Sequence, residues 1–142
     1  MKQALSKERL PQLRFLSMGI IVLAVLTAVI HLIAALGTFW AMSHEPAPAG
    51  STPEGLLMFA ILFLLNCVGY LVLVVALYLP WLQRFQPLTR WLLIGYTALT
   101  IVLWYLIEAS HADLFEYSDK LIEAVLIALL LIEGWQTRRR TA

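Results

Sequence analysis

Four long apolar runs follow one another along the chain, and short polar stretches separate them. The runs cover residues 15–42, 55–79, 89–108 and 117–136. Each is long enough to form a helix of about 20 residues, the length that crosses the hydrocarbon core of a membrane. We therefore predict four transmembrane helices. The last run is the weakest of the four, because only its middle part, residues 124–132, lacks charged residues.

The second run begins and ends at clear helix signals. Thr52 offers a capping hydroxyl, Pro53 takes the first helical position, and Glu54 places an acid at the positive end of the helix dipole. Pro80 follows the run and stops the helix, because proline cannot continue the backbone hydrogen bonds. The first run is far longer than the roughly 7–15 residues of a signal-peptide core, so we expect it to remain as a span.

The composition supports a membrane protein. Of the 142 residues, 61% are hydrophobic and 13% are charged, and the mean hydropathy is +0.83. A soluble domain carries about twice this share of charge, and so short a chain cannot bury this much apolar surface in its own core. The net charge of +1 gives no dense basic patch of the kind that nucleic acid requires, so we expect no nucleic-acid partner.

Basic residues predict the orientation of the spans. If the chain crosses four times, nine of its ten Lys and Arg residues fall on one side and only Lys120 falls on the other. By the positive-inside rule, both termini are then cytoplasmic. Short connections make neighbouring helices antiparallel, so we predict an all-α, up-down four-helix bundle with residues 1–142 as a single domain. The nine basic residues are Lys2, Lys7, Arg9, Arg14, Arg84, Arg90, Arg138, Arg139 and Arg140.

Ionisable residues inside a span are informative, because charge is costly at membrane depth. A helical rise of about 1.5 Å per residue puts His31 about 24 Å above Phe15, in the outer third of a core of roughly 30 Å. The same rise puts Glu108 near the outer boundary and Glu123 about 9 Å below it. We therefore predict an intramembrane polar cluster of His31, Glu108 and Glu123.

Helical spacing predicts that His31 faces protein. Ala24, Ala28 and Ala35 share a stripe with it along one side of the helix. Small residues along a stripe are typical of close contacts between membrane helices. His31 should therefore point into the bundle.

The last run offers a matching stripe. Ala124 and Ala128 form a second small-residue pattern beside Glu123. If both stripes point inward, His31 meets Glu123 or Glu108, and a carboxylate accepts its N–H. A histidine with an acidic partner often only holds two helices together; a proton or ion path and a ligand site are the alternatives.

Further polar groups lie in the inner half of the spans. Asn66 and Tyr70 are four residues apart and share a helix face, and Tyr96 lies on the third run. Buried Asn and Tyr residues commonly bridge helices, with about 1 kcal/mol each, so we predict that these three do so. A pocket for a quinone or a lipid headgroup is the alternative. The single Cys67 excludes an intrachain disulfide and a multi-cysteine metal site.

Potential metal ligands gather at the outer end of the predicted bundle. His111 and Asp113 match no recognised ligand spacing, and Ser110 with Asp113 resembles a helix capping box instead. A haem with two histidine ligands needs both at one depth, and only His31 lies deep. We therefore predict no metal and no cofactor. The candidate ligands are His44, Glu45, His111, Asp113, Glu116 and Asp119.

No motif in the sequence identifies a family, and no serine sits in a nucleophile elbow, so we expect no enzyme. The leading hypothesis is a small non-catalytic integral membrane protein, an accessory or structural subunit that packs against a larger membrane complex or against itself. One alternative is a small transporter or proton relay that uses His31, Glu108 and Glu123. Another is a redox-associated subunit that binds quinone or haem. Compactness favours the bacterial cytoplasmic (inner) membrane, with the lipid bilayer and other membrane subunits as partners.

Overall fold

A computed structural model of the chain describes residues 2–44, 46, 51–107 and 114–141, and for 2–13, 115, 140 and 141 it describes the backbone alone. Every element in this part of the chain is a helix. The elements are α1 (Lys2–His44), α2 (Pro53–Tyr78), the short 3-10 helix η1 (Pro80–Phe85), α3 (Gln86–Ile107) and α4 (Leu114–Thr141).

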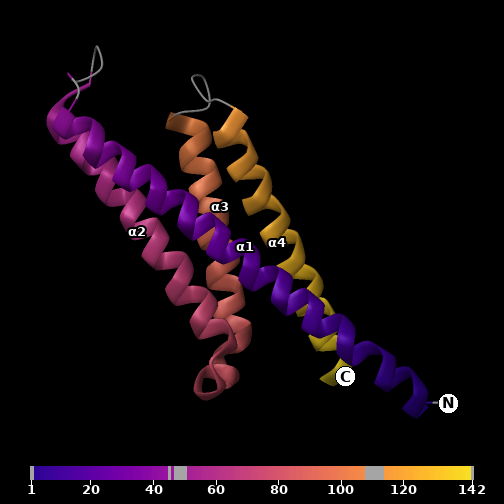
Figure 1. The fold of residues 1–142 in the computed structure, drawn as a ribbon. Coiled ribbons are helices and arrows are strands. Elements are labelled where there is room, and N and C mark those ends of the chain that lie inside the picture. The colour runs from indigo at the N-terminus through magenta and orange to yellow at the C-terminus, as the bar shows by residue number, and fades with distance from the viewer. Residues whose placement is uncertain (1, 45, 47–50, 108–113, 142) are drawn as a thin grey trace.

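Consecutive helices run in opposite directions and pack into a bundle (Figure 1). α1 packs along α2, α2 against α3, α3 against α4, and α4 back against α1, so the four helices form a closed ring. η1 joins α2 to α3 at the lower end of Figure 1, and the two helices stay close there. At the upper end, the α1–α2 pair and the α3–α4 pair stand apart. The predicted up-down order of four helices is therefore the observed one.

Three stretches are long and apolar enough to cross a membrane, judged by length and composition. They are Arg14–His44, Pro53–Tyr78 and Pro80–Ile107, which correspond to the first three predicted spans. α4 contains the fourth predicted span, residues 117–136, but it is not among them. Charged residues, including Glu123 and Glu133, recur along its length.

The predicted signals at the two ends of α2 are confirmed. The Thr52 hydroxyl accepts a hydrogen bond from the backbone N–H of Gly55 at 3.1 Å, and Pro53 is the first helical residue. α2 ends at Tyr78, and Pro80 is the first residue of η1. The capping box predicted at Ser110 and Asp113 lies outside the described residues.

Each helix buries a stripe of residues spaced mainly three and four apart, the spacing of knobs-into-holes packing. The inward stripe predicted on α1 is confirmed, because Ala24, Ala28, His31 and Ala35 are all buried. The buried stripes are Ile20, Ala24, Thr27, His31 and Ala35 on α1; Cys67, Tyr70, Val74 and Leu77 on α2; Arg90, Leu93, Thr97 and Thr100 on α3; and Glu123, Leu126, Leu130 and Glu133 on α4.

The condition that the Ala124 and Ala128 stripe points inward is not met, since both residues are exposed. The inward face of α4 is taken by Glu123 and the leucines that follow it. Ala124 follows Glu123 by one position and is rotated from it by about 100°. Ala128 lies two positions from both Leu126 and Leu130, on the opposite side of the helix, so both alanines point outward. The outward side of α4 is apolar. Its exposed large side chains include Leu121, Val125, Leu131, Ile132 and Trp135.

Candidate functional site

Glu123 lies at the centre of a polar network inside the bundle, and its side chain is fully buried. The hydroxyl of Tyr70 on α2 donates a hydrogen bond to its Oε1 at 2.9 Å. The hydroxyl of Thr100 on α3 lies 3.1 Å from the same oxygen and 2.8 Å from the carbonyl of Thr97. A hydroxyl has one proton, so Thr100 serves one of these two acceptors at a time.

His31 of α1 completes a set of residues drawn from all four helices. Its Nε2 lies 4.0 Å from Oε1 of Glu123, and the ring is almost fully buried between Phe63 and Tyr70. Nδ1 is 2.9 Å from the backbone carbonyl of Thr27. A carbonyl oxygen can only accept, so Nδ1 carries a proton and donates it to Thr27.

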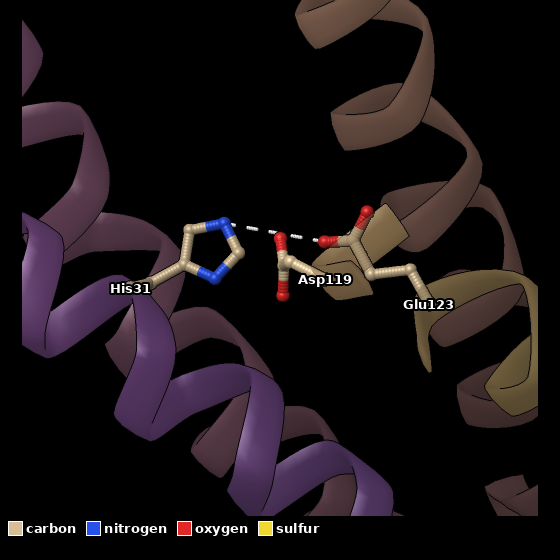
Figure 2. Close-up of side chains that lie close together, drawn as sticks. All are labelled: His31, Asp119 and Glu123. Carbon is tan, nitrogen blue, oxygen red and sulfur yellow. Dashed lines mark ion pairs between the residues drawn. The ribbon is translucent and has the colours of Figure 1, made fainter. Parts of the chain in front are cut away.

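Asp119 and Lys120 extend this network along α4. The ammonium of Lys120 lies 2.8 Å from Oδ2 of Asp119 and 3.0 Å from Oε2 of Glu123, so it bridges the two carboxylates. The other oxygen of Asp119, Oδ1, is buried without a hydrogen-bond partner among the described residues. Figure 2 shows the Asp119 carboxylate between the His31 ring and Glu123. The His31 network comprises His31, Tyr70, Thr100, Asp119, Lys120 and Glu123.

A second polar network lies nearer the C-terminal end of α4. Oε2 of Glu133 accepts a hydrogen bond from Nη2 of Arg90 at 3.1 Å, and both side chains are buried. Oε1 of Glu133 accepts from Ser17 at 2.7 Å and from Tyr78 at 3.0 Å. These four residues, one from each helix, form the Arg90 network. Arg90 lies against α4 at Gly134, where an added Cβ would stand 3.1 Å from Cδ of Arg90.

A layer of apolar side chains separates the two networks. Along α4, Leu126 and Leu130 lie between Glu123 and Glu133, and both leucines are fully buried. The two glutamates are therefore about 15 Å apart along the helix axis. The layer is completed by residues at the corresponding places on the other helices, which are Ile20, Ala24, Val74, Leu77 and Leu93.

A pocket of about 320 Å³ lies between α2 and α3 and reaches the His31 network. His31, Thr100 and Lys120 line its polar end. Several residues on its walls are also exposed on the outside of the bundle, so the pocket is open on one side. Its apolar lining consists of Phe59, Leu62, Phe63, Leu65, Leu99, Leu103, Trp104 and Ile107.

Asn66 and Tyr96 also line this pocket and connect α2 to α3. The Tyr96 hydroxyl donates to Oδ1 of Asn66 at 2.6 Å. Nδ2 of Asn66 has no hydrogen-bond partner within the described part of the chain. The Tyr96 ring lies directly over Gly69, where an added Cβ would collide with its hydroxyl and stand 2.7 Å from Cζ. Gly69 is thus the residue that lets Tyr96 approach α2.

The structure brings some of the predicted site residues together, and others lie outside the described residues. It brings His31 and Glu123 together, and it connects Tyr70 to Glu123 as well as Asn66 to Tyr96. Glu108, the third member of the predicted cluster, lies outside the described residues, as do Glu45, His111 and Asp113 among the candidate metal ligands.

Sequence reasoning missed the whole Arg90 network and the burial of Asp119. It named Asp119 as a candidate ligand at the wet outer end of the bundle, yet Asp119 lies within α4 and is 5% exposed. It counted Arg90 among the basic residues that flank the spans, and it gave Glu133 no role. A signal was present, because Glu123, Leu126, Leu130 and Glu133 follow the 3-4-3 spacing of one buried seam.

The chemistry available here is that of two carboxylates, an imidazole and an ammonium beside an apolar pocket. Such a set can bind a cation or hold the polar head of an amphiphile. No protein family, no curated protein sequence and no solved structure matches this chain.

Proposed function

We propose that α4 is a fourth transmembrane span and that both termini lie on the cytoplasmic side. The charges that interrupt its sequence are directed into the bundle, where Glu123 and Glu133 are buried, while its outward side chains are apolar. Lipid would therefore meet an apolar helix surface. The orientation rests on the basic residues, nine of which fall on one side of a four-span chain. Trp91 and Trp135 line one pocket at that end, as an interfacial belt requires.

Our proposal for the function is non-catalytic binding. The protein would hold a quinone-like amphiphile between α2 and α3 and serve as an accessory subunit of a larger membrane complex or of a homo-oligomer. One observation carries the binding role: the pocket has apolar, aromatic walls and a polar end, and its volume of about 320 Å³ is in the range of small-molecule sites.

The polar groups of the pocket favour a ligand with carbonyl acceptors. The Asn66 amide and the Lys120 ammonium both line the pocket, and each carries N–H donors. Phe59, Phe63 and Trp104 supply aromatic surface for a planar ring. A quinone combines two carbonyl oxygens, a planar ring and an apolar tail, and the open side of the pocket lets the tail extend into lipid.

The apolar layer between the two networks favours binding over conduction. A proton relay needs a chain of polar groups or water across the bundle. Leu126 and Leu130 are fully buried between Glu123 and Glu133, so the described residues offer no such chain through the centre. The His31 network is therefore better suited to hold a ligand than to pass a proton across.

A pair of glycine variants tests the binding role. In Gly69→Ala the new methyl group displaces the Tyr96 ring, which changes the pocket wall and breaks the hydrogen bond to Asn66. Gly95→Ala is the matched control, because no atom lies within 4 Å of its added Cβ. The probe is a short-chain ubiquinone, titrated against each protein in lipid nanodiscs while tryptophan fluorescence is recorded, since Trp104 lines the pocket.

We expect the unmodified protein and Gly95→Ala to bind the quinone with equal affinity and Gly69→Ala to bind it about tenfold more weakly, a loss of about 1.4 kcal/mol. Absence of saturable quenching in the unmodified protein would refute the quinone proposal. So would equal affinity in both variants, because the ligand would then sit elsewhere.

The accessory role has a separate test. The protein is extracted from its native membrane in a mild detergent and separated by size together with any bound protein. We expect it to elute in a stable complex with another membrane protein or with copies of itself. A monodisperse single chain with no partner would overturn the accessory role and leave the binding role standing.

A further inference from the structure

Three potential metal ligands converge inside the His31 network. His31, Asp119 and Glu123 are 4%, 5% and 0% exposed, and each offers a ligand atom within 4.8 Å of the others (Figure 2). They come from α1 and from two successive turns of α4. The geometry points to a divalent-metal site that is formed by Nε2 of His31 and by one carboxylate oxygen each of Asp119 and Glu123.

The hydrogen bond at the far side of the imidazole prepares His31 for this role. Nδ1 carries the proton and donates it to the carbonyl of Thr27 at 2.9 Å. In the neutral ring, the lone pair is then on Nε2, which faces Oε1 of Glu123 at 4.0 Å. Metal-binding histidines characteristically hold their second ring nitrogen in this way, because the bond fixes both the tautomer and the ring orientation.

An unpartnered oxygen points to a missing cation. Oδ1 of Asp119 is buried and accepts no hydrogen bond from the described residues. Lys120 binds Oδ2 of Asp119 and Oε2 of Glu123, so it leaves Oδ1 and Oε1 for another partner. Oε1 accepts a hydrogen bond from Tyr70 and lies 3.1 Å from the Thr100 hydroxyl. When Thr100 donates to the carbonyl of Thr97 instead, the second lone pair of Oε1 is free for a metal ion.

The charges of the network support the same conclusion. When both carboxylates are ionised, Asp119 and Glu123 bring two negative charges and Lys120 neutralises one of them. With a neutral imidazole, one negative charge remains without a cation among the described residues, in a part of the bundle where unpaired charge is costly. A metal ion at Nε2 and Oδ1 would supply the positive charge at the place where it is missing.

One nitrogen and two carboxylate oxygens suit zinc, with manganese and iron as related candidates. Zinc binds such ligands tetrahedrally at about 2.0–2.2 Å, which places the ligand atoms roughly 3.3–3.6 Å from one another. The ligand atoms, now up to 4.8 Å apart, must therefore approach one another by up to about 1.5 Å. The pocket between α2 and α3 reaches His31 and leaves room for the open fourth position of a zinc site.

The test uses the full chain in lipid nanodiscs after metal has been stripped with a chelator. Zn²⁺ is titrated against a competing fluorescent chelator, and Co²⁺ absorption reports the coordination geometry. Asp119→Asn and His31→Ala remove one ligand each, and the near-isosteric Asp119→Asn keeps an oxygen for Lys120. His44→Ala is the matched control, because His44 makes the same Nδ1 bond to a carbonyl of α1 at 2.9 Å but is exposed.

We expect one Zn²⁺ per chain in the unmodified protein and in His44→Ala, with affinity at least about tenfold weaker in Asp119→Asn and in His31→Ala. Absence of Zn²⁺ binding by the unmodified protein would overturn the proposal. Unchanged affinity in both ligand variants would overturn it as well. No quinone is present in this experiment, so its outcome is independent of the quinone proposal.

Discussion

The His31 network and the Arg90 network follow one plan and differ in how completely they are paired. Each takes residues from all four helices, and each centres on a glutamate of α4 that accepts a hydrogen bond from a tyrosine of α2. Both border a pocket, of about 320 and 350 Å³ respectively. Around Glu133, one guanidinium and two hydroxyls occupy both carboxylate oxygens. Around Glu123, two carboxylates share one lysine, and an oxygen of Asp119 has no partner.

The difference teaches that burial alone does not distinguish a helix contact from a binding site. In the Arg90 network both carboxylate oxygens have a hydrogen-bond partner, and the unpartnered buried atom, Nε of Arg90, is a donor that cannot bind a metal ion, so this network is suited to hold the helices together. An incompletely paired network keeps ligand atoms that can bind an ion or a small molecule. The free-energy cost of burying its unpaired polar groups is offset where a bound ligand pairs with them. The three predictions that follow probe this contrast, in order of decreasing effect on stability.

Breaking the ion pair should have the largest effect. Arg90→Leu leaves the Glu133 carboxylate buried with only hydroxyl partners, and we expect a loss of about 3–5 kcal/mol in the free energy of unfolding. His31→Leu in the other network should lose only about 1 kcal/mol, because His31 has one hydrogen bond, to Thr27. Unfolding in mixed micelles with a denaturing detergent measures the free energy of unfolding of both variants.

The conservative Arg90→Lys keeps a charge near Glu133 and should fall between these two values. Equal losses in the arginine and histidine variants would contradict the contrast, because both networks would then hold the bundle to the same extent.

An added methyl group against Arg90 should have an intermediate effect on the free energy of unfolding. Gly134→Ala places a methyl group 3.1 Å from Cδ of Arg90 and pushes the guanidinium away from Glu133. We expect a loss of about 1–3 kcal/mol, typical of overpacking. Gly95→Ala should be neutral or gain up to about 1 kcal/mol, because nothing lies within 4 Å and alanine favours helix. Thermal unfolding of both variants in one detergent measures the difference in stability. A Gly134→Ala protein as stable as Gly95→Ala would show that the Arg90 side chain moves aside without loss of stability.

Removing single hydroxyls should have the smallest effect. Ser17→Ala deletes one of the two hydrogen bonds to Oε1 of Glu133, and we expect a loss of about 0.5–1 kcal/mol. Thr27→Val removes a buried hydroxyl that has no hydrogen-bond partner among the described residues, so it should be neutral or stabilising. Unfolding in the same mixed micelles shows whether each substitution raises or lowers the free energy of unfolding. A loss in Thr27→Val as large as in Ser17→Ala would indicate that Thr27 takes part in the His31 network.

The order of the helices was predictable, because apolar length and turn chemistry are local properties. Thr52, Pro53 and Pro80 mark ends of helices through the backbone of their own neighbourhood. The proximity of His31 and Glu123 was also within reach, since depth follows from helical rise and the face of α1 from its alanine stripe.

The Arg90 network was not predictable in the same way. Arg90 and Glu133 lie near the ends of the predicted spans 89–108 and 117–136, where a long side chain can reach water as easily as a partner. Only the packing of α3 against α4 decides whether such a side chain reaches water or its partner. That packing depends on contacts between residues that are distant in sequence. Ala124 and Ala128 show the same limit: small size permits a close contact, but the neighbouring Glu123 seam determined which face turned inward.

The inward charges of α4 have a consequence for how the protein is made. A charged residue near the centre of a lone helix adds about 2.5–3.5 kcal/mol to its insertion from the translocon, and α4 carries Glu123 and Glu133 on one seam. Both glutamates find partners on α3, at Thr100 and Arg90. If α4 crosses the membrane as proposed, α3 and α4 gain by inserting together as a hairpin, because Arg90 and Glu133 are then paired from the start.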